Sequence, residues 1–418
     1  MAETDDFLNG ENVNWHPRVH GKVFAFAALL ALPVWSHPAA GATRTAEALP
    51  AASAAPNPAA TSRSLSASAS ASASTPSAAS SAFSAPAAPR VPVIRVPRTS
   101  GRITARELGL VINTADPYSV EVGERYIKAR KLGASQVLRL ALPVKPSLTP
   151  DELKPLVAAI AARFGAATHA LALAWQQPFA VGCNSITGAL TLGYDAALCE
   201  HTCAPSRLSP YFNSATSRPF TDLKLRPTML LAARDIAGAR ALIQRGVDAD
   251  RSLGWRGAPP AHAYYVITND RARSARAPLF PPPGLLRPWG VDVHVESTQA
   301  VEGAQRVLIY QTGLEWVGKL ETLRWVPGAL ADHLTSYGGV LVAGSQMSAL
   351  AWIASGATAS YGTVSEPCAH PQKFPHPQAL LIHYLQGSSA IEAYWKSVAW
   401  PQQGVFVGEP LAAPFARP

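Results

Sequence analysis

The sequence predicts an α/β protein in which a layered, largely parallel β-sheet is covered by crossover helices. Short apolar runs recur between residues 99 and 418, and segments with helical periodicity separate them. Such runs are typical of strands buried on both faces, and strands that alternate with helices favour parallel pairing. The roughly 320 residues of this region suffice for one large domain.

The expected strands are short runs of apolar residues. The clearest are LGLVIN at Leu108 to Asn113 and HALALA at His169 to Ala174. Bounded apolar runs of this length favour strands over helices. Further strands are expected at Val137 to Leu142, Met229 to Ala232, Ala263 to Ile267, Val291 to Val295, Arg306 to Tyr310, Gly339 to Ala343, Thr358 to Tyr361 and Val405 to Val407.

Three helices have recognisable ends. Thr149 to Glu152 (TPDE) combines an N-cap, a proline at the first helical position and a capping-box glutamate. A second helix is expected from Asp235 to Gln244, with Gly246 as its left-handed C-cap. Ser389 to Glu392 (SAIE) is another capping box, and an apolar stripe between Ile391 and Val398 predicts a buried helix face.

The first 42 residues are expected to form an export signal. A basic stretch at Arg18 and Lys22 precedes the apolar run Val23 to Trp35, and Ala40 to Ala42 (AGA) supplies a small-x-small cleavage pattern. The run is shorter than the about 20 residues that a membrane-spanning helix needs. Cleavage after Ala42 is the prediction, and an uncleaved interfacial anchor is the alternative.

Residues 43–98 are almost entirely alanine, serine and proline. This composition cannot bury enough apolar surface to offset the entropy of folding, so a disordered linker is expected. It would act as a tether or as a simple spacer. The predicted organisation is therefore a signal peptide at 1–42, a linker at 43–98 and an α/β domain at 99–418, with two subdomains (99–255 and 256–418) as an alternative.

The chain is basic, with a formal net charge of +9. Its arginines are scattered, and no basic stripe with interleaved aromatic residues appears, so no nucleic-acid partner is expected. The expected partners are envelope polysaccharide, anionic lipid or surface-sorting proteins. No phosphate-binding glycine motif follows a strand, and neither a cofactor nor a dedicated metal site is predicted.

Four cysteines in an exported chain predict disulfides. Cys199 and Cys203 are the expected pair, because they lie four residues apart around His201. Cys183 and Cys368 would then pair with each other or stay free. Four cysteines allow three complete pairings, and sequence alone does not choose among them.

The segment from Gly356 to Pro377 carries the densest cluster of reactive side chains: Glu366, Cys368, His370 and His376. Three hypotheses apply to it. Cys368 is a nucleophile with His370 or His376 as its base and Glu366 orienting that base; or Cys368 and the two histidines bind a metal; or the segment is structural. Residues two apart in an extended chain point to opposite sides, so Cys368 and His370 meet only if the loop turns.

Polar residues follow several of the expected strands, where open parallel sheets place their ligands. We expect a shared cleft near Glu366, with local turn chemistry as the alternative. The candidate binding residues are Asn113, Asp116, Asn269, Asp270, Arg271, Arg273 and Ser345.

Several segments together resemble a family of secreted bacterial proteins that accompanies the exosortase and PEP-CTERM surface-sorting system. They include VINTADPYS (Val111 to Ser119), YYVITNDRARSARA (Tyr264 to Ala277), the long stretch from Gln346 to Pro377, and GEPLAAPF (Gly408 to Phe415). The resemblance implies a periplasmic or secreted accessory or binding protein of an envelope sorting or exopolysaccharide system. It implies no molecular activity.

A weaker resemblance is to gingipain-like and caspase-like cysteine peptidases, in which a histidine and the nucleophilic cysteine follow neighbouring strands. The corresponding turns here are Gln311 to Gly313 and Gly344-Ser345, and neither holds the expected residue. This resemblance implies a Rossmann-like or caspase-like sheet. A cysteine-dependent hydrolase that uses Cys368 with a nearby histidine is the alternative function.

Overall fold

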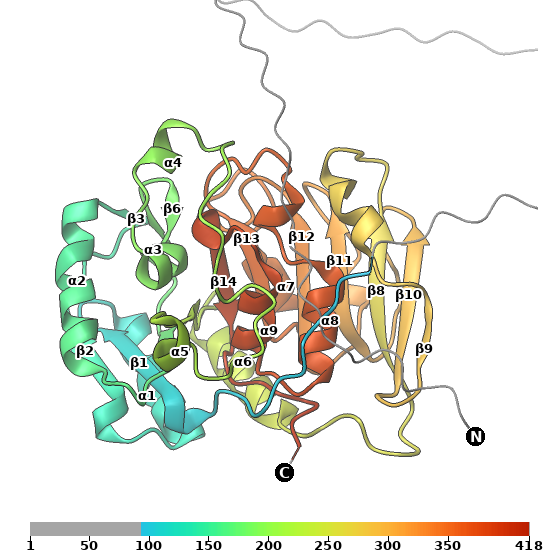
Figure 1. The fold of residues 1–418 in the computed structure, drawn as a ribbon, viewed down its shortest axis with the longest axis horizontal. Helices are drawn as coiled ribbons and strands as arrows, with labels where there is room; N and C mark the ends of the chain where they lie inside the picture. Colours follow the sequence, from blue (N-terminus) through green and yellow to red (C-terminus); the bar gives the residue numbers. More distant parts are fainter. Residues whose placement is uncertain (1–92, 418) are drawn as a thin grey trace, which may run out of the picture. The chain divides into compact units, whose positions relative to one another are not determined.

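The computed structural model describes residues 93–417, which belong to one compact unit (Figure 1). The predicted signal peptide and residues 43–92 of the predicted linker lie outside the described residues. Within 93–417, no helix combines the length and the apolar character that crossing a membrane requires.

An eleven-stranded, largely parallel sheet forms the centre of the fold, as predicted. Its strand order is β2-β1-β4-β7-β14-β13-β12-β11-β8-β10-β9. The antiparallel pairs are β13 with β14 and β10 with β9. Strand β14 pairs with β7 in parallel, through Val407 and Leu230. The strands are β1 (Leu108–Asn113), β2 (Val137–Leu140), β4 (Ala170–Leu173), β7 (Thr228–Leu230), β8 (Ala261–Ile267), β9 (Gly284–Leu286), β10 (Val291–Ser297), β11 (Val307–Gly313), β12 (Trp325–Leu334), β13 (Ala359–Thr363) and β14 (Gly404–Gly408).

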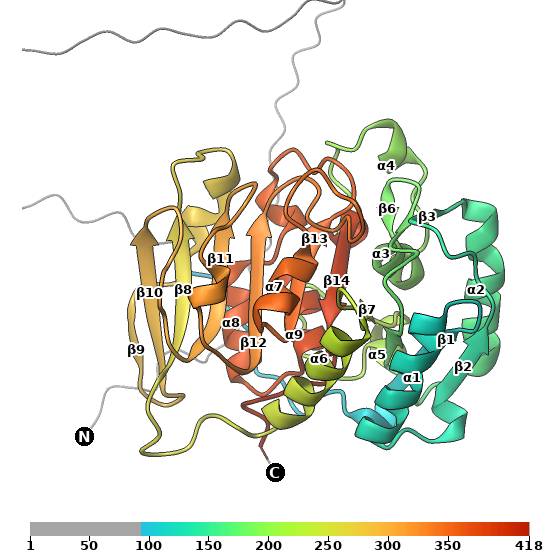
Figure 2. The same ribbon diagram turned by 180° about the vertical axis from the view of Figure 1, so that it is seen from behind.

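Helices cover both faces of the sheet. Figures 1 and 2 show α1, α6 and α7 on one face and α3, α8 and α9 on the other. A small sheet of β3 (Ser147–Leu148), β5 (Ala180–Val181) and β6 (Asn184–Ser185) lies beside the main one. The helices are α1 (Pro117–Arg130), α2 (Pro150–Arg163), α3 (Ile186–Leu192), α4 (Ala197–Glu200), α5 (Pro219–Leu223), α6 (Ile236–Ala249), α7 (Ala349–Ser355), α8 (Pro377–Leu385) and α9 (Ala390–Ser397).

The predicted helix starts are confirmed. Thr149 begins α2 with a capping box, Asp235 caps α6 and Ser389 begins α9 with a second capping box. The predicted end of α6 is wrong, because the helix passes through Gly246 and continues to Ala249. Gly246 is needed there for packing, since a Cβ at this position would collide with the side chain of Glu409.

One expected strand is wrong. Residues 339–343 form a loop, and the strand of this region is β12, which runs from Trp325 to Leu334. The loop packs its backbone tightly against β13: a Cβ on Gly339 would collide with the carbonyl of Gly362. Of the apolar side chains of this loop, Leu341 is buried in the core and Val342 is exposed.

The folded unit begins earlier than the predicted linker boundary at residue 98. The backbone N–H of Ile94 donates to the Gln378 side chain at 3.1 Å, and that of Thr99 donates to Gln386 at 2.9 Å. Both partners lie on or beside α8. Side-chain acceptors of the folded region thus fix this segment, whose residues 93–98 (VIRVPR) contain no alanine or serine.

Three ion pairs are buried within residues 93–417; one is Lys396 with Glu392 on α9, 3.7 Å apart, and the other two involve arginines. Arg276 donates to Asp332 on β12 at 2.5 Å, and both side chains are at most 1% exposed. Asp332 also accepts a hydrogen bond from Gln311 of β11 at 2.8 Å. In the other pair, Arg130 at the end of α1 lies 2.7 Å from Glu409, which follows β14. These two pairs link α1 and the segment after β8 to the sheet, and removing one partner of such a buried pair leaves an uncompensated charge.

Candidate functional site

A hollow of about 250 Å³ lies between the loops that follow three strands of the sheet. Its walls are residues 272–273 after β8, 334–336 at the end of β12, and 366–369 after β13. Among the sequence-predicted residues, Arg273, Glu366 and Cys368 all line it. Chemically distinct side chains from distant parts of the chain therefore meet at one place.

Arg273 is held rigidly at one wall. Its guanidinium donates to Asp270 at 2.7 Å and to the Thr335 hydroxyl at 3.2 Å, and it lies 3.7 Å from Glu315. Partial burial opposes ionisation of Asp270, but hydrogen bonds from the backbone and side chain of Arg273 outweigh it and lower the pKa of this carboxyl. The result is a fixed cation, about a quarter exposed, beside a hydroxyl.

The opposite wall is a tightly constrained turn. Cys368 and Ala369 both adopt left-handed backbone conformations, with φ of 56° and 53°. Each such residue costs roughly 1–2 kcal/mol when it is not glycine. The Glu366 carboxylate accepts from the Cys368 N–H at 2.7 Å, and the Gln403 side chain donates to the Glu366 carbonyl at 3.0 Å. Glu366 therefore stabilises this turn and does not orient a histidine.

The predicted disulfide between Cys199 and Cys203 is wrong. Cys199 bonds to Cys183, and Cys203 bonds to Cys368, each pair with a Cα–Cα distance of 5.2 Å. Helix α4 places Cys199 against the turn before β6, whereas Cys203 lies beyond the helix and faces the loop after β13. All four cysteines of the chain are thus paired. Cys368 in this state has no thiolate with which to attack a substrate.

The two histidines of the predicted cluster have structural surroundings. The His370 ring packs edge-on against Trp400, with centroids 5.9 Å apart. His376 caps α8 by accepting from the Ala379 N–H at 3.4 Å, and burial lowers its pKa to about 4. Across residues 93–417, no hydrogen bond joins either ring to Cys368 or Glu366. The hypotheses of a cysteine–histidine pair and of a metal site at these residues are therefore wrong for this disulfide-bonded state.

Asn113 and Asp116 belong to a different part of the sheet. Asn113 is buried and exchanges hydrogen bonds with the backbone of Leu142, while Asp116 caps α1. Six strands lie between β1 and β8 in the sheet order, and the seven steps of about 4.8 Å from strand to strand add up to roughly 34 Å. The expectation that these residues share a cleft with the loop after β8 is wrong, and turn chemistry accounts for them.

The remaining candidates lie outside the hollow. Asn269 and Arg271 are exposed on the loop after β8. Asp270 does not line the hollow, but its carboxylate accepts a hydrogen bond from Arg273, which does. Ser345 is exposed in the loop before α7, whose N-cap is Ser348. Ser345 therefore does not stand at the N-terminus of α7.

Lys373, which sequence reasoning missed, is buried behind the turn of Cys368. Its amine donates to the carbonyl of Thr202, the neighbour of Cys203, at 2.5 Å. Burial lowers the pKa of Lys373 to about 8, although the charge of Glu366 acts in the opposite direction. Its position in the segment QKFPHP offers no signal of burial. The contact depends on a residue that lies 171 positions away in the chain.

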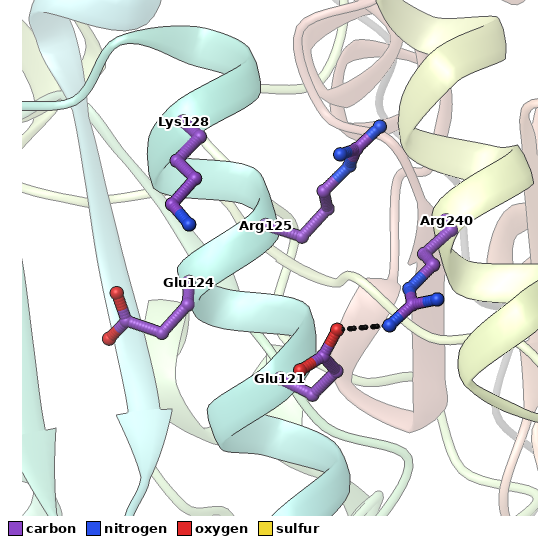
Figure 3. A pocket seen from close by; sticks show the side chains of 5 residues that line it. All are labelled: Glu121, Glu124, Arg125, Lys128 and Arg240. Carbon is purple, nitrogen blue, oxygen red and sulfur yellow. Dashed lines mark hydrogen bonds and ion pairs between the residues drawn. The ribbon is translucent and has the colours of Figure 1, made fainter.

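A second, larger hollow of about 490 Å³ lies on the surface between α1 and α6. Figure 3 shows its lining of Glu121, Glu124, Arg125, Lys128 and Arg240, in which Arg240 pairs with Glu121 at 2.5 Å. Both members of this pair are about half exposed, as expected for a solvated helix surface. The hollow carries no buried polar group that would select a ligand.

A third cluster was also missed by sequence reasoning. His262 on β8 and Asp292 and His294 on β10 come close enough to share a metal ion. The signal is the pair Asp292-x-His294 within an alternating strand, VDVHVES. Its histidine partner lies about 30 residues earlier, and only the pairing of β8 with β10 brings the three together.

No protein-family model matches this chain, and a search of curated proteins finds no match either.

Proposed function

We propose that this chain is a binding protein of the bacterial envelope, and that the hollow between the loops after β8, β12 and β13 binds a sugar unit of an envelope polysaccharide. The observation that carries the proposal is the chemistry of the hollow. A fixed guanidinium, the hydroxyls of Thr335 and Ser336, and the backbone around Glu366 line one small space. Such groups donate and accept hydrogen bonds with hydroxyl-rich ligands.

The size of the hollow supports a small ligand group. Its volume of about 250 Å³ is below the about 300–1,000 Å³ of drug-sized pockets. One ring or one terminal unit of a polymer is the appropriate occupant. The openness of the site at a loop edge suits a polymer whose remaining units stay in solvent.

The two disulfides support a location outside the cytoplasm. Structural disulfides form and persist in oxidising compartments such as the periplasm. Both bonds involve the loops beside the hollow, since Cys368 is in its wall and Ser365 donates to the carbonyl of Cys183 at 2.7 Å. The oxidised form is therefore the form in which the hollow has this shape.

A cysteine-dependent hydrolase is the second candidate, and one observation favours it. Lys373, with a pKa of about 8, contacts the loop of Cys203 and experiences the charge of Glu366. A dithiol reductant that exchanges with the bond between Cys203 and Cys368 would release both cysteines as thiols and would itself become a disulfide, and the neutral amine of Lys373 would then accept a proton from one of them. This function requires a reduced state, whereas binding operates in the oxidised one.

A tryptophan in the hollow is expected to block binding. Ser336 lines the hollow, and its side chain makes no hydrogen bond within residues 93–417, so Ser336→Trp fills the space without removing a partner. We expect at least about 10-fold weaker binding to the recognised glycan, measured with an array of envelope polysaccharides and then by calorimetry.

Ser345→Trp is the matched control, because Ser345 lies on a neighbouring exposed loop outside the lining. It should bind as the unaltered chain does. Equal binding by both variants would place the ligand elsewhere, and no binding to any polysaccharide by the unaltered chain would reject the proposed ligand class. Thermal unfolding of each variant establishes that it is folded.

A further inference from the structure

We infer that His262, Asp292 and His294 form a binding site for a divalent transition metal, with Zn²⁺ as the best-matched ion. The three donor atoms lie within 4.8 Å of one another. The inference concerns a different part of the molecule from the hollow, and it does not depend on the proposed function.

The pairing of two strands creates the cluster. Strands β8 and β10 are parallel, with His262 opposite Asp292 and Tyr264 opposite His294. Side chains two residues apart in a strand point to the same face, so Asp292, His294 and His262 share one face of the sheet. On the other face, Val291 and Val293 are buried in the main core. The ligands thus project from a rigid platform, as a preorganised metal site requires.

The distances between the donor atoms fit one metal ion. Nδ1 of His262 lies 3.0 Å from Nε2 of His294, and the same Nε2 lies 3.6 Å from Oδ2 of Asp292. A zinc ion with bonds of about 2.0–2.2 Å places neighbouring tetrahedral ligands about 3.3–3.6 Å apart. The first separation is shorter than this range, the second is at its upper end, and the third, between His262 and Asp292, is at most 4.8 Å. The side chains therefore rotate as the ion binds.

The surroundings of the cluster favour a cation. The ring of Tyr264 stacks on His294 with centroids 4.7 Å apart and an interplanar angle of 15°, which fixes the orientation of the imidazole. Glu296 lies two residues after His294 on the same face of β10 and adds a negative charge near the cluster. Arg306 contributes a positive charge near His262.

The donor set selects the class of metal. Two imidazole nitrogens and one carboxylate suit Zn²⁺ and other late first-row divalent ions, whereas Mg²⁺ and Ca²⁺ prefer oxygen ligands only. All three side chains are partly exposed. Three protein ligands leave a coordination position open toward solvent, which is the arrangement of zinc sites that bind water or an external ligand.

Metal titration of the full chain, prepared without a histidine tag and stripped with a chelator, tests the inference. We expect about one Zn²⁺ per chain by elemental analysis after dialysis against about 10 µM free Zn²⁺. We also expect a rise of the unfolding temperature with Zn²⁺ and none with Mg²⁺, because a ligand that binds only the folded state stabilises it. Co²⁺ in the site should give the visible absorption of a low-coordinate complex.

Variants identify the ligands. His294→Gln and Asp292→Asn are expected to weaken Zn²⁺ binding at least about 10-fold, since even partners that merely orient metal ligands contribute that much. His201→Gln, an exposed histidine outside the cluster, is the matched control and should bind like the unaltered chain. Asp292→Asn keeps the size of the side chain and takes the place of His294→Gln if that variant does not fold. Undiminished binding by the folded variants, or no stoichiometric binding by the unaltered chain, would overturn the site.

Discussion

Replacing Asp332 with alanine is expected to lower the free energy of unfolding by about 3–5 kcal/mol, because it leaves the guanidinium of Arg276 buried without its counter-charge. Arg276 is 1% exposed, and the carbonyls of Thr312 and Pro375 are its remaining partners, at 2.8 and 3.2 Å. Two carbonyl groups do not compensate a desolvated positive charge. Urea unfolding of the oxidised protein measures the change.

The control for this prediction is Asp151→Ala. Its carboxylate pairs with Lys154 at the surface and is 86% exposed, so no measurable loss is expected. A double variant, Arg276→Met with Asp332→Leu, removes both charges and should recover part of the loss. If Asp332→Ala is as stable as the unaltered chain, the guanidinium of Arg276 does not depend on Asp332 as its buried counter-charge.

Acidification is expected to destabilise the fold steeply, because buried histidines cannot take up protons. Burial lowers the pKa of His333 and of His383 to about 3 each. Below the ordinary histidine pKa of about 6.5, the unfolded chain binds these protons and the folded chain does not. Stability is therefore fully present above pH 6.5 and is lost as the pH falls toward the folded pKa. His376, whose pKa burial lowers to about 4, contributes in the same direction, and three such groups correspond to about 4.1 kcal/mol per pH unit well below pH 6.5.

Urea unfolding at pH 7, 6 and 5 measures this slope. His383 is hydrogen-bonded to the Asn213 side chain at 3.2 Å, so His383→Gln keeps a polar partner while it removes one titrating group. In this variant the unfolded state takes up one proton fewer, so the free energy of unfolding should change with pH by about 1.4 kcal/mol per pH unit less than in the unaltered chain. His201→Gln removes an exposed histidine and should leave the slope unchanged. A flat profile for the unaltered chain between pH 6 and 5 would contradict the prediction.

Local sequence signals predicted the fold where local interactions decide the structure. The capping boxes at Thr149 and Ser389 satisfy backbone groups within one turn, so their effect does not depend on distant residues. Strand β12 was missed because Pro327 and Asp332 interrupt its apolar pattern. Arg276 and Gln311 satisfy the carboxylate of Asp332 inside the sheet, and no periodicity in the sequence reveals that partnership.

The site was predicted only in part, for the same reason. The loops after β8 and β13 were expected to carry ligand-binding residues, and Arg273 and Glu366 do meet there. The pairing of Cys203 with Cys368 joins residues 165 positions apart, and the spacing of the cysteines favoured a shorter loop. The His262 cluster likewise depends on the register between β8 and β10. Contacts of this kind are set by tertiary packing.

Hydrogen–deuterium exchange of the oxidised chain, with and without the envelope polysaccharide that it binds, locates the binding site. We expect slower exchange in the backbone around Arg273, Thr335 and Ala369, in the three loops that enclose the hollow. The surface between α1 and α6 should exchange at an unchanged rate. Protection confined to that surface, or to no part of residues 93–417, would contradict the assignment of the hollow as the binding site.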